Sequence, residues 1–367
     1  MIFNKTNLYL INSYFYSYFA LLIRLSLDLF DLDKIEIICK SSIYFIFSSL
    51  HSTFYSFFIT NFIIVIFELT ILGANAAIPA HGRFPTSQVL CIHHRYYLID
   101  CGEGAQIQLF RHKIKINKIH AIFISHLHGD HFFGLMGLLN TMNLRGRAEP
   151  LYLHAPKGLQ EIIILQLKYS CSILNYPIHF IETNQEESVF LFEDEKVTVH
   201  TIPLLHRIPC CGFLFREKAK DKNLIKEKIP TDLSIAGRIA LKKGEDVEYN
   251  NQILKNEDYT YPPNKKRSYA FCSDTVYLPS LIEIIQDVDL LYHEATFTNV
   301  HEKRAAQTFH STGEQAARIA KQANVGQLIL GHFSTRYYDL SPLLEEAQAV
   351  FPNSALAIEG QTFPINE

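Results

Sequence analysis

Residues 125–132 read Ser-His-Leu-His-Gly-Asp-His-Phe, and this octet brings together side chains that bind metal ions in proteins. Three imidazoles and one carboxylate lie within six positions, at His126, His128, Asp130 and His131. Imidazole nitrogens and carboxylate oxygens are ligands of zinc and related divalent cations. A solvated polar loop seldom carries the order H-x-H-x-D-H inside an apolar frame. The octet therefore predicts a metal site.

The segments on both sides of the octet predict how it is held. Residues 119–124 form a short apolar run typical of a β-strand, and residues 132–144 are apolar with helical spacing. The octet thus falls on a strand-to-helix loop at the end of a sheet. Binding and catalytic residues of α/β proteins are commonly found at such loops.

Two metal ions need about eight ligand positions, so the octet alone is too small for a dinuclear site. Three further candidates, His206, Asp274 and His332, each come directly after an apolar run of strand type. A single histidine or aspartate after a strand is more often an ordinary turn residue. Side chains at strand ends can nevertheless converge on one edge of a sheet, which makes the three positions candidates for the same site.

The remaining pattern favours an α/β fold in which two mixed β-sheets pack face to face, with helices on the outer faces. In both halves of the chain, strands alternate first with hairpins and then with helices. The predicted strands are 68–73, 87–93, 96–100, 119–124, 151–154, 196–204, 211–216, 268–272, 289–293, 326–331 and 355–358. The predicted helices are 105–112, 132–144, 156–169, 278–286, 312–323 and 343–350. The hairpin between the second and third strands is expected to turn at His94 and Arg95.

Residues 217–267, called the insertion below, differ from this pattern. They are rich in Lys, Glu, Asp and Asn and show little periodicity. Loops of this length are usually functional or disordered, and a solvated insertion without a role is the alternative. We divide the chain into residues 1–65 and a domain at 66–367 from which the insertion protrudes like an arm.

Residues 1–65 contain no Gly and no Pro, and the stretches 6–23 and 41–67 lack charged residues. Uncharged stretches of this length are compatible with a membrane anchor, whereas a signal peptide fits poorly because no small-residue cleavage site follows. The composition is also what A+T-rich DNA encodes when a start codon is assigned too far upstream. A true start near 64–66 would then be a non-AUG codon. Unusual packed helices are the third interpretation.

Composition excludes few functions. The chain has 367 residues, 48% hydrophobic and 19% charged, which suffices for one large domain or two ordinary ones. The formal net charge of −3 does not indicate a nucleic-acid partner, so RNA binding would need a local basic patch. Seven cysteines, an odd number without a C-x-x-C pair, indicate a reducing compartment, and we expect a cytoplasmic protein.

Seven segments resemble the metallo-β-lactamase superfamily and, within it, the ribonuclease Z family, endonucleases that trim the 3′ end of precursor tRNA. The resemblance covers about residues 67–360. Within the superfamily, the ribonuclease Z family is indicated by three segments: His-Glu-Ala-Thr at 293–296, Phe-His-Ser-Thr at 309–312 and the end of 330–337. The other matching segments are 98–104, 125–132, 203–206 and 272–275.

The resemblance implies two zinc ions in each subunit, although manganese also suits such nitrogen and oxygen ligands. It assigns seven ligands, with one zinc held by His126, His128 and His206, the other by Asp130, His131 and His332, and Asp274 bridging both. Asp100 is expected to orient a ligand histidine from outside the ligand set.

The resemblance also implies the catalytic roles. Asp130 is expected to accept the proton of the attacking water, and His310 to donate one to the leaving 3′ oxygen. Glu294 is expected to keep His310 protonated, because a nearby carboxylate raises a histidine pKa. Arg336 is expected to neutralise a phosphate oxygen. Two simpler alternatives remain. His310 could be a helix N-terminal residue without a catalytic role, and Arg336 could form an ordinary surface ion pair.

By resemblance, the substrate is precursor tRNA, the products are a tRNA 3′-hydroxyl and a trailer 5′-phosphate, and the enzyme is a homodimer. The insertion resembles in position the flexible arm that grips tRNA from the partner subunit, but the usual Gly-Pro-rich tip is not evident. No membrane partner is expected unless residues 1–65 are a real anchor. Residues 72–79 and Ala105 lack two hydroxyls that are usual in the family, which is expected to loosen contacts near the site.

Two other functions remain open on the residues alone. One is a different dinuclear-zinc hydrolase of the same fold, arylsulfatase-like or lactonase-like. The other is a non-catalytic zinc-fold RNA-binding protein, which a missing ligand would have favoured. Cleavage of precursor tRNA at the discriminator base distinguishes the nuclease from both.

Overall fold

The structure is a computed structural model that describes residues 66–366. The three interpretations of residues 1–65 therefore lie outside the described residues. Within residues 66–366, no helix is long and apolar enough to cross a membrane.

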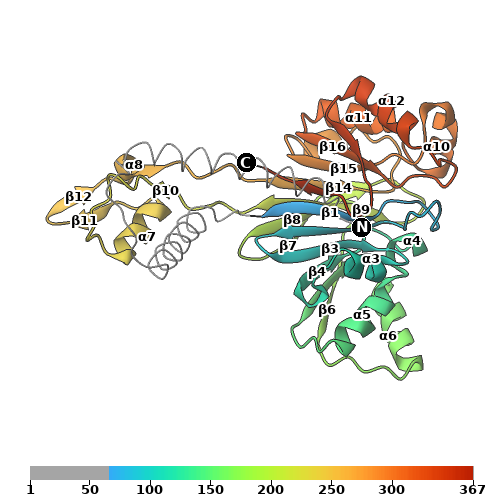
Figure 1. The fold of residues 1–367 in the computed structure, drawn as a ribbon, viewed down its shortest axis with the longest axis horizontal. Coiled ribbons are helices and arrows are strands. Elements are labelled where there is room, and N and C mark those ends of the chain that lie inside the picture. The colour runs from blue at the N-terminus through green and yellow to red at the C-terminus, as the bar shows by residue number, and fades with distance from the viewer. Residues whose placement is uncertain (1–65, 367) are drawn as a thin grey trace, which may run out of the picture. The chain divides into compact units, whose positions relative to one another are not determined.

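Two seven-stranded sheets form the centre of the domain (Figure 1). The first has the order β18-β1-β2-β3-β4-β5-β6, and the second β17-β16-β15-β14-β9-β8-β7. The strands of the first are β1 (Phe67–Gly73), β2 (Ser87–Ile92), β3 (Arg95–Cys101), β4 (Ile119–Phe123), β5 (Leu151–Ala155), β6 (Ile178–Glu182) and β18 (Thr362–Pro364). Those of the second are β7 (Phe190–Glu193), β8 (Val197–Leu204), β9 (Cys210–Glu217), β14 (Ser268–Cys272), β15 (Leu290–Glu294), β16 (Gln327–Gly331) and β17 (Ser354–Leu356).

Helices cover the outer face of each sheet. The first sheet carries α3 (Ala105–Arg111), α4 (Gly129–Phe132), α5 (Leu135–Leu144) and α6 (Leu159–Tyr169). The second carries α9 (Leu281–Ile284), α10 (Glu302–Thr308), α11 (Gly313–Gln322) and α12 (Ser341–Val350). The predicted fold, two mixed sheets face to face with helices outside, is confirmed.

Strand alternation explains the two apolar layers. In β3, Tyr97 and Ile99 belong to the core between the sheets, whereas Leu98 belongs to the core beneath the helices. Successive side chains of a strand point to opposite faces, so a strand buried on both faces is apolar throughout. β3 and β4 are parallel, as are β14, β15 and β16. Their carboxyl ends therefore come together at the edge where the octet begins.

The hairpin between β2 and β3 turns at His93 and His94, one residue earlier than predicted. Both residues have positive φ, 49° and 67°, as in the type I′ turn that suits the twist of two paired strands. Arg95 instead begins β3 and pairs with Ile92.

The predicted helix 132–144 is interrupted at Gly134. The N–H of Gly134 donates to the carbonyl of Cys101 at 2.9 Å. A Cβ at this position would lie 2.2 Å from the carbonyl oxygen of Gly102. This close packing separates α5 from α4, so that α4 contains part of the octet itself.

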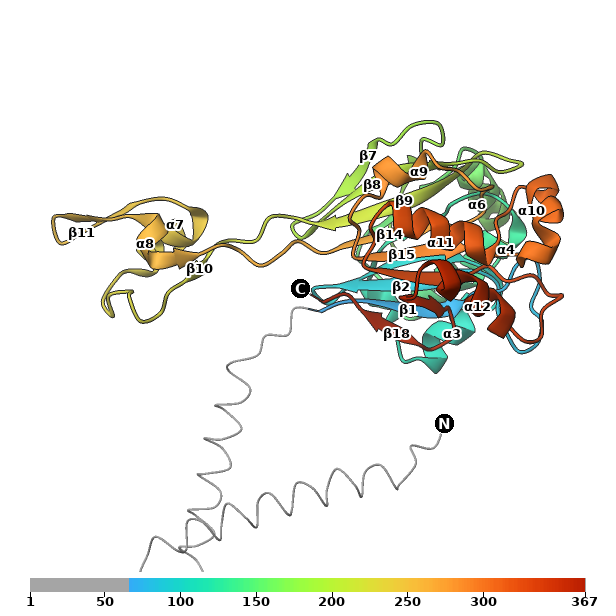
Figure 2. The same ribbon diagram turned by 90° about the horizontal axis from the view of Figure 1, so that it is seen from above.

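The insertion has more regular structure than its lack of periodicity predicts. It contains β10 (Asn223–Leu224), α7 (Ile235–Lys243), β11 (Val247–Tyr249), β12 (Gln252–Leu254), α8 (Asn256–Tyr259) and β13 (Thr260–Tyr261). Leu233, Leu241 and Leu254 form a small apolar core of its own. Figure 2 shows these elements gathered together and joined to β9 and β14 by two extended segments. Elements this short carry no periodic signal.

A buried ion pair closes the base of the insertion. Arg267 donates to the carboxylate of Glu217 from Nε at 2.9 Å and from Nη2 at 2.6 Å. Both residues are buried, at 4% and 3% exposure. The pair ties the end of β9 to the start of β14.

Candidate metal centre

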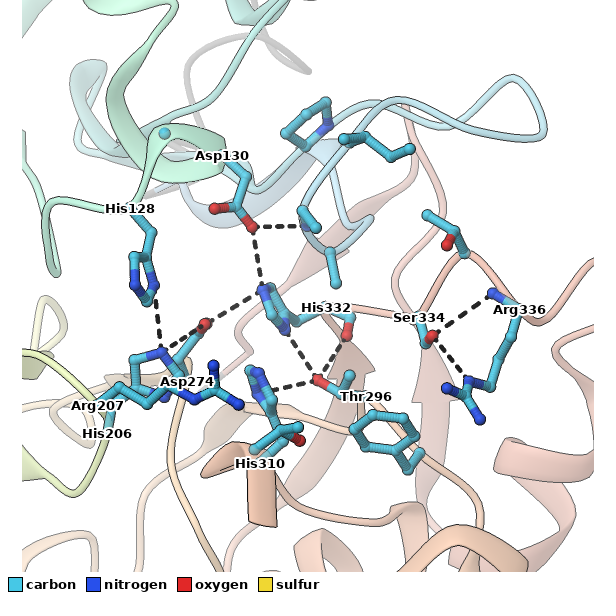
Figure 3. A pocket seen from close by; sticks show the side chains of 18 of the residues that line it. His128, Asp130, His206, Arg207, Asp274, Thr296, His310, His332, Ser334 and Arg336 are labelled. Atoms are coloured by element: carbon cyan, nitrogen blue, oxygen red, sulfur yellow. Dashed lines mark hydrogen bonds and ion pairs between the residues drawn. The ribbon is translucent and has the colours of Figure 1, made fainter. Parts of the chain in front are cut away.

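The octet follows β4 and brings four side chains into two adjoining groups. Figure 3 shows two of them, His128 and Asp130, at the cavity. His126 and His128 precede α4, and Asp130 and His131 lie within it. His126 and His131 are fully buried. The loop after β4 and the first turn of α4 therefore bring these four side chains into the same region.

The second sheet supplies the other three predicted ligands. His206 lies two residues beyond β8, Asp274 two residues beyond β14, and His332 directly after β16. The structure brings all seven residues into two adjoining groups.

The first group has the spacing of a tetrahedral site. His128 Nδ1 lies 3.0 Å from His126 Nε2 and 3.2 Å from His206 Nε2. Asp274 Oδ2 lies 3.6 Å from the Nε2 atoms of His126 and His206. Ligands about 2.05 Å from a tetrahedral zinc are about 3.3 Å apart, so these residues fit the ion.

The second group shares Asp274 with the first. Asp274 Oδ1 lies 3.3 Å from His131 Nε2 and 3.2 Å from His332 Nε2. Asp130 Oδ2 lies 3.5 Å from each of the same two nitrogens. One carboxylate oxygen of Asp274 thus faces each group, which is the arrangement of a bridging ligand.

In three of the candidate ligand histidines, the ring nitrogen that faces away from the site is held by another group. His131 Nδ1 lies 2.7 Å from Asp100, His332 Nδ1 lies 2.9 Å from Thr296 Oγ1, and His206 Nδ1 lies 2.9 Å from the carbonyl of Phe309. The buried Nε2 atoms of His131 and His332 have no hydrogen-bond partner. Buried polar atoms are rarely left unpaired, so the donor set suits a divalent cation between these nitrogens.

Three residues around the site have left-handed backbone although they are not glycine. The φ values are 53° for Asp100, 60° for Phe309 and 57° for His332. Such conformations cost on the order of 1–3 kcal/mol each and persist only where their surroundings fix them. These backbone conformations direct the Asp100 carboxylate to His131 and the Phe309 carbonyl to His206. The same conformation at His332 directs its ring to Asp274.

Electrostatics divides the histidines into two kinds. Burial lowers the pKa of His126, His128 and His206, which keeps these rings neutral and able to bind a cation. Burial alone would also lower the pKa of His131, but three surrounding carboxylates raise it well above its usual value. Without a cation, a proton on His131 therefore compensates part of the buried negative charge.

His310 and Glu294 form a pair beside the second group. His310 Nδ1 lies 2.8 Å from Glu294 Oε1, and its ring stacks on that of His332 with centroids 5.3 Å apart. Burial by itself would lower the pKa of His310, but the fully buried carboxylate of Glu294 raises it to about 9. A proton donor thus lies next to the candidate metal ligands.

Arg336 lines the same cavity, which has a volume of about 660 Å³. Its Nε lies 3.3 Å from Ser334 Oγ, and its guanidinium lies over the ring of Phe297, 5.0 Å from the centroid. Arg207 and Arg304 also line the cavity and were not predicted. Single arginines outside a motif give no sequence signal that separates them from ordinary surface residues.

One of the two segments that lack the usual hydroxyls contacts the site through its backbone. The N–H of Ala77 donates to Asp130 Oδ2 at 2.7 Å, a backbone contact that needs no hydroxyl. Ala105 is buried at the start of α3.

Thr296 and Ser125 lie inside the motifs, but their sequence positions predict no role for either residue. Thr296 Oγ1 donates to Glu294 at 2.7 Å and also contacts His332. Ser125 Oγ donates to Asp100 at 2.9 Å and lies 3.0 Å from His126 Nδ1. Their hydroxyls link the candidate ligand histidines to buried carboxylates. Both residues are adjacent in sequence to predicted site residues or motifs, and this adjacency is the feature that could have predicted their roles.

The chain is similar to known proteins in sequence and in fold. A protein-family model described as Anti-Pycsar protein Apyc1 matches residues 67–221. Ribonuclease Z of Cytophaga hutchinsonii is 50% identical over 303 residues, 82% of this chain and 97% of that protein. Ribonuclease Z of Bacteroides fragilis is 47% identical over 295 residues, 80% of this chain and 97% of that protein. The crystal structure of human tRNase Z, short form, is 28% identical with a TM-score of 0.60, covering 82% of this chain and 100% of that chain.

Proposed function

The chain belongs to the ribonuclease Z family of metallo-β-lactamase-fold endoribonucleases, and from this membership we propose that it removes the 3′ trailer of precursor tRNA. The products are a tRNA ending in a 3′-hydroxyl and a trailer with a 5′-phosphate. One observation carries the proposal: two ligand groups share Asp274 and lie beside the His310–Glu294 pair.

The spacing of the ligands supports two zinc ions per subunit, and manganese can occupy the same nitrogen and oxygen set. His126, His128 and His206 would hold one ion and Asp130, His131 and His332 the other, with Asp274 shared. When bound, two such cations lower the pKa of a water molecule and neutralise phosphate charge.

The side chains that line the cavity carry out the proton transfers and bind the phosphate. The Asp130 carboxylate accepts the proton of the attacking water. His310 is held at Nδ1 by Glu294, so its other ring nitrogen donates a proton to the leaving 3′ oxygen. Arg336, held by Ser334, pairs with a phosphate oxygen. Asp100 takes no part in proton transfer and orients His131.

The insertion is assigned to binding tRNA away from the cut. Lys226, Lys243 and Lys266 are exposed on or beside it, which suits contact with an RNA backbone. In a homodimer, the insertion of one subunit would grip the tRNA that is cut by the other.

The homodimer has a candidate face on the outer side of α6. Ile162, Leu165 and Tyr169 are 40%, 55% and 78% exposed there. Contiguous exposed apolar side chains commonly mark protein interfaces. Sedimentation of the full chain would measure the assembly state, and a monomer at micromolar concentration would contradict this assignment.

We place the enzyme in the cytoplasm, where precursor tRNA and reduced thiols are both found. The six cysteines within residues 66–366 are all free, which agrees with a reducing compartment.

The decisive experiment is a cleavage assay on one precursor tRNA, with the metal content measured on the same sample. We expect a cut after the discriminator base and about two metal ions per subunit. His310→Ala should keep both ions and lose most turnover. Hydrolysis of an aryl sulfate or a lactone without a precursor cut would favour the other hydrolases. RNA binding without any hydrolysis would favour the non-catalytic interpretation.

A further inference from the structure

The cavity beside the candidate ligands has two chemically different sides. One side is basic and presents three exposed arginines, Arg207, Arg304 and Arg336. Within residues 66–366, none of the three forms an ion pair with a carboxylate. The other side is mainly apolar and is lined by Ala76, Ala77, Ile78, Pro85 and Phe133, with the carboxylate of Glu103 beside them. Backbone phosphates suit the first side, whereas the apolar side offers them no charged partner and the Glu103 carboxylate beside it repels them.

Phe133 is the largest exposed apolar side chain of that second side. It is 68% exposed, although it directly follows α4 and the octet. The ring lies against Gly129, where a Cβ would be only 2.2 Å from Phe133 Cε2. The ring of Phe132 packs against it edge-on with centroids 5.0 Å apart. Most of the ring is therefore exposed at the cavity, while Gly129 and Phe132 restrict its position from the protein side.

Ile78 borders the same part of the cavity and is 58% exposed. It follows Ala77, whose N–H donates to Asp130 Oδ2 at 2.7 Å. Ile78 and Phe133 therefore both lie on the Asp130 side of the candidate metal centre. We call Ile78, Pro85 and Phe133 the base slot.

The base slot lies across the centre from the proton donor. Figure 3 shows His128 and Asp130 on one side of Asp274 and His332, with His310 and Thr296 on the other. The last tRNA nucleotide carries the oxygen that His310 protonates, so it lies on the His310 side. The first trailer nucleotide is joined through another phosphate oxygen and extends away from His310.

We propose that the base slot binds the nucleobase of the first trailer nucleotide, stacked on Phe133 and in contact with Ile78. This inference rests on the proposed function. Stacking on an aromatic ring accepts every base, because each base has a π-face. The slot therefore positions the trailer without selecting its sequence, which suits a substrate whose trailers differ.

A double-mutant cycle tests the slot through cleavage. Phe133→Ala is compared with the unmodified protein on three precursors: an intact one, one abasic at the first trailer nucleotide and one abasic at the discriminator. On the intact precursor, kcat/KM should fall about tenfold, in line with the loss of one base–aromatic stack. The trailer-abasic precursor should show no further loss, whereas the discriminator-abasic precursor should show the full loss. Equal losses on all three precursors would overturn the proposal.

Two control variants separate stacking from general damage. Phe133→Tyr keeps the ring and should restore most of kcat/KM. Phe190→Ala removes an aromatic side chain that is 56% exposed on β7, outside this cavity, and should change nothing. All variants should keep the metal content of the unmodified protein.

A binding measurement separates this inference from the proposed function. A 5′-phosphorylated trailer RNA with 2-aminopurine as its first nucleotide should lose fluorescence on binding, and Phe133→Ala should abolish that quenching. If no precursor is cut but the Phe133-dependent quenching is present, the proposed function fails and the slot stands. If the precursor is cut and quenching is absent or independent of Phe133, the slot fails and the nuclease stands.

Discussion

Glu294→Gln tests the proposed role of Glu294 in keeping His310 protonated as a general acid. Glu294 is fully buried and accepts hydrogen bonds from the Thr275 N–H at 3.0 Å and the Thr296 N–H at 3.1 Å, besides its contact with His310. Glutamine keeps the size of the side chain and removes the charge. The pKa of His310, which burial lowers and Glu294 raises to about 9, then falls to its ordinary value of 6.5 or below.

The expected loss of rate follows from the fraction of His310 that is protonated. A general acid acts when it is protonated, so a lower pKa removes activity at the high end of the pH range first. At about pH 7.5, a histidine with a pKa near 9 is almost wholly protonated, and one near 6.5 is about one-tenth protonated. The variant should therefore lose about tenfold in kcat at that pH.

The assay is single-turnover cleavage of precursor tRNA between about pH 5.5 and pH 9, with the metal content checked at each pH. The ratio of variant to unmodified rate is the observable, because titrations common to both proteins cancel. The ratio should rise toward one as the pH falls. A ratio that stays constant with pH would refute the argument that Glu294 acts through the proton on His310.

A matched control is available on the chain. Glu346 accepts hydrogen bonds from the N–H of Asn299 at 3.0 Å and 2.9 Å and lies outside the cavity. Glu346→Gln removes a partly buried carboxylate without touching His310. Its rate ratio should stay near one at every pH.

Three further predictions follow from other parts of the structure. Because carboxylates raise the pKa of His131, metal binding should displace the His131 proton, and metal affinity should weaken as the pH falls. Calorimetry in buffers of different ionisation enthalpy should show proton release on metal binding, and metal binding without proton release would contradict this prediction. Glu217→Ala leaves buried Arg267 without its carboxylate and should lower the free energy of unfolding by about 3 kcal/mol, measured by urea denaturation. Although burial raises it, Arg267 lowers the pKa of Glu217 from 4.5 to about 2, so this stabilisation should be present above pH 4.5 and disappear as the pH falls toward 2. Replacing residues 222–262 with a short linker should preserve metal content and hydrolysis of bis(p-nitrophenyl) phosphate but weaken precursor binding, and unchanged precursor affinity would remove the insertion from the binding site.

The sequence predicted the long strands because their side chains report burial on each face. Leu328, Ile329 and Leu330 of β16 are apolar in succession and buried, and β3 alternates between two apolar layers. Short edge elements were missed. β18 has three residues and is defined by pairing with β1, a contact between distant segments that no local pattern records.

The seven candidate ligands were predicted because metal-binding residue types are rare and keep a fixed spacing beyond strand ends. The contacts behind them were harder to find. The carbonyl of Phe309 holds His206 through its backbone, so the identity of its side chain carries no signal. Phe133 looked like one more apolar residue of a helix, and only the structure shows its ring facing the cavity.

The division of the ligands between the two sheets has a consequence for biosynthesis. The octet supplies four candidate ligands early in the chain, and the candidate bridging residue Asp274 and His332 are translated much later. A nascent chain that ends before Asp274 carries the octet but lacks residues of both candidate ligand groups. The nuclease therefore becomes competent only when the second sheet is complete, and incomplete translation products present no cutting centre to the RNA around the ribosome.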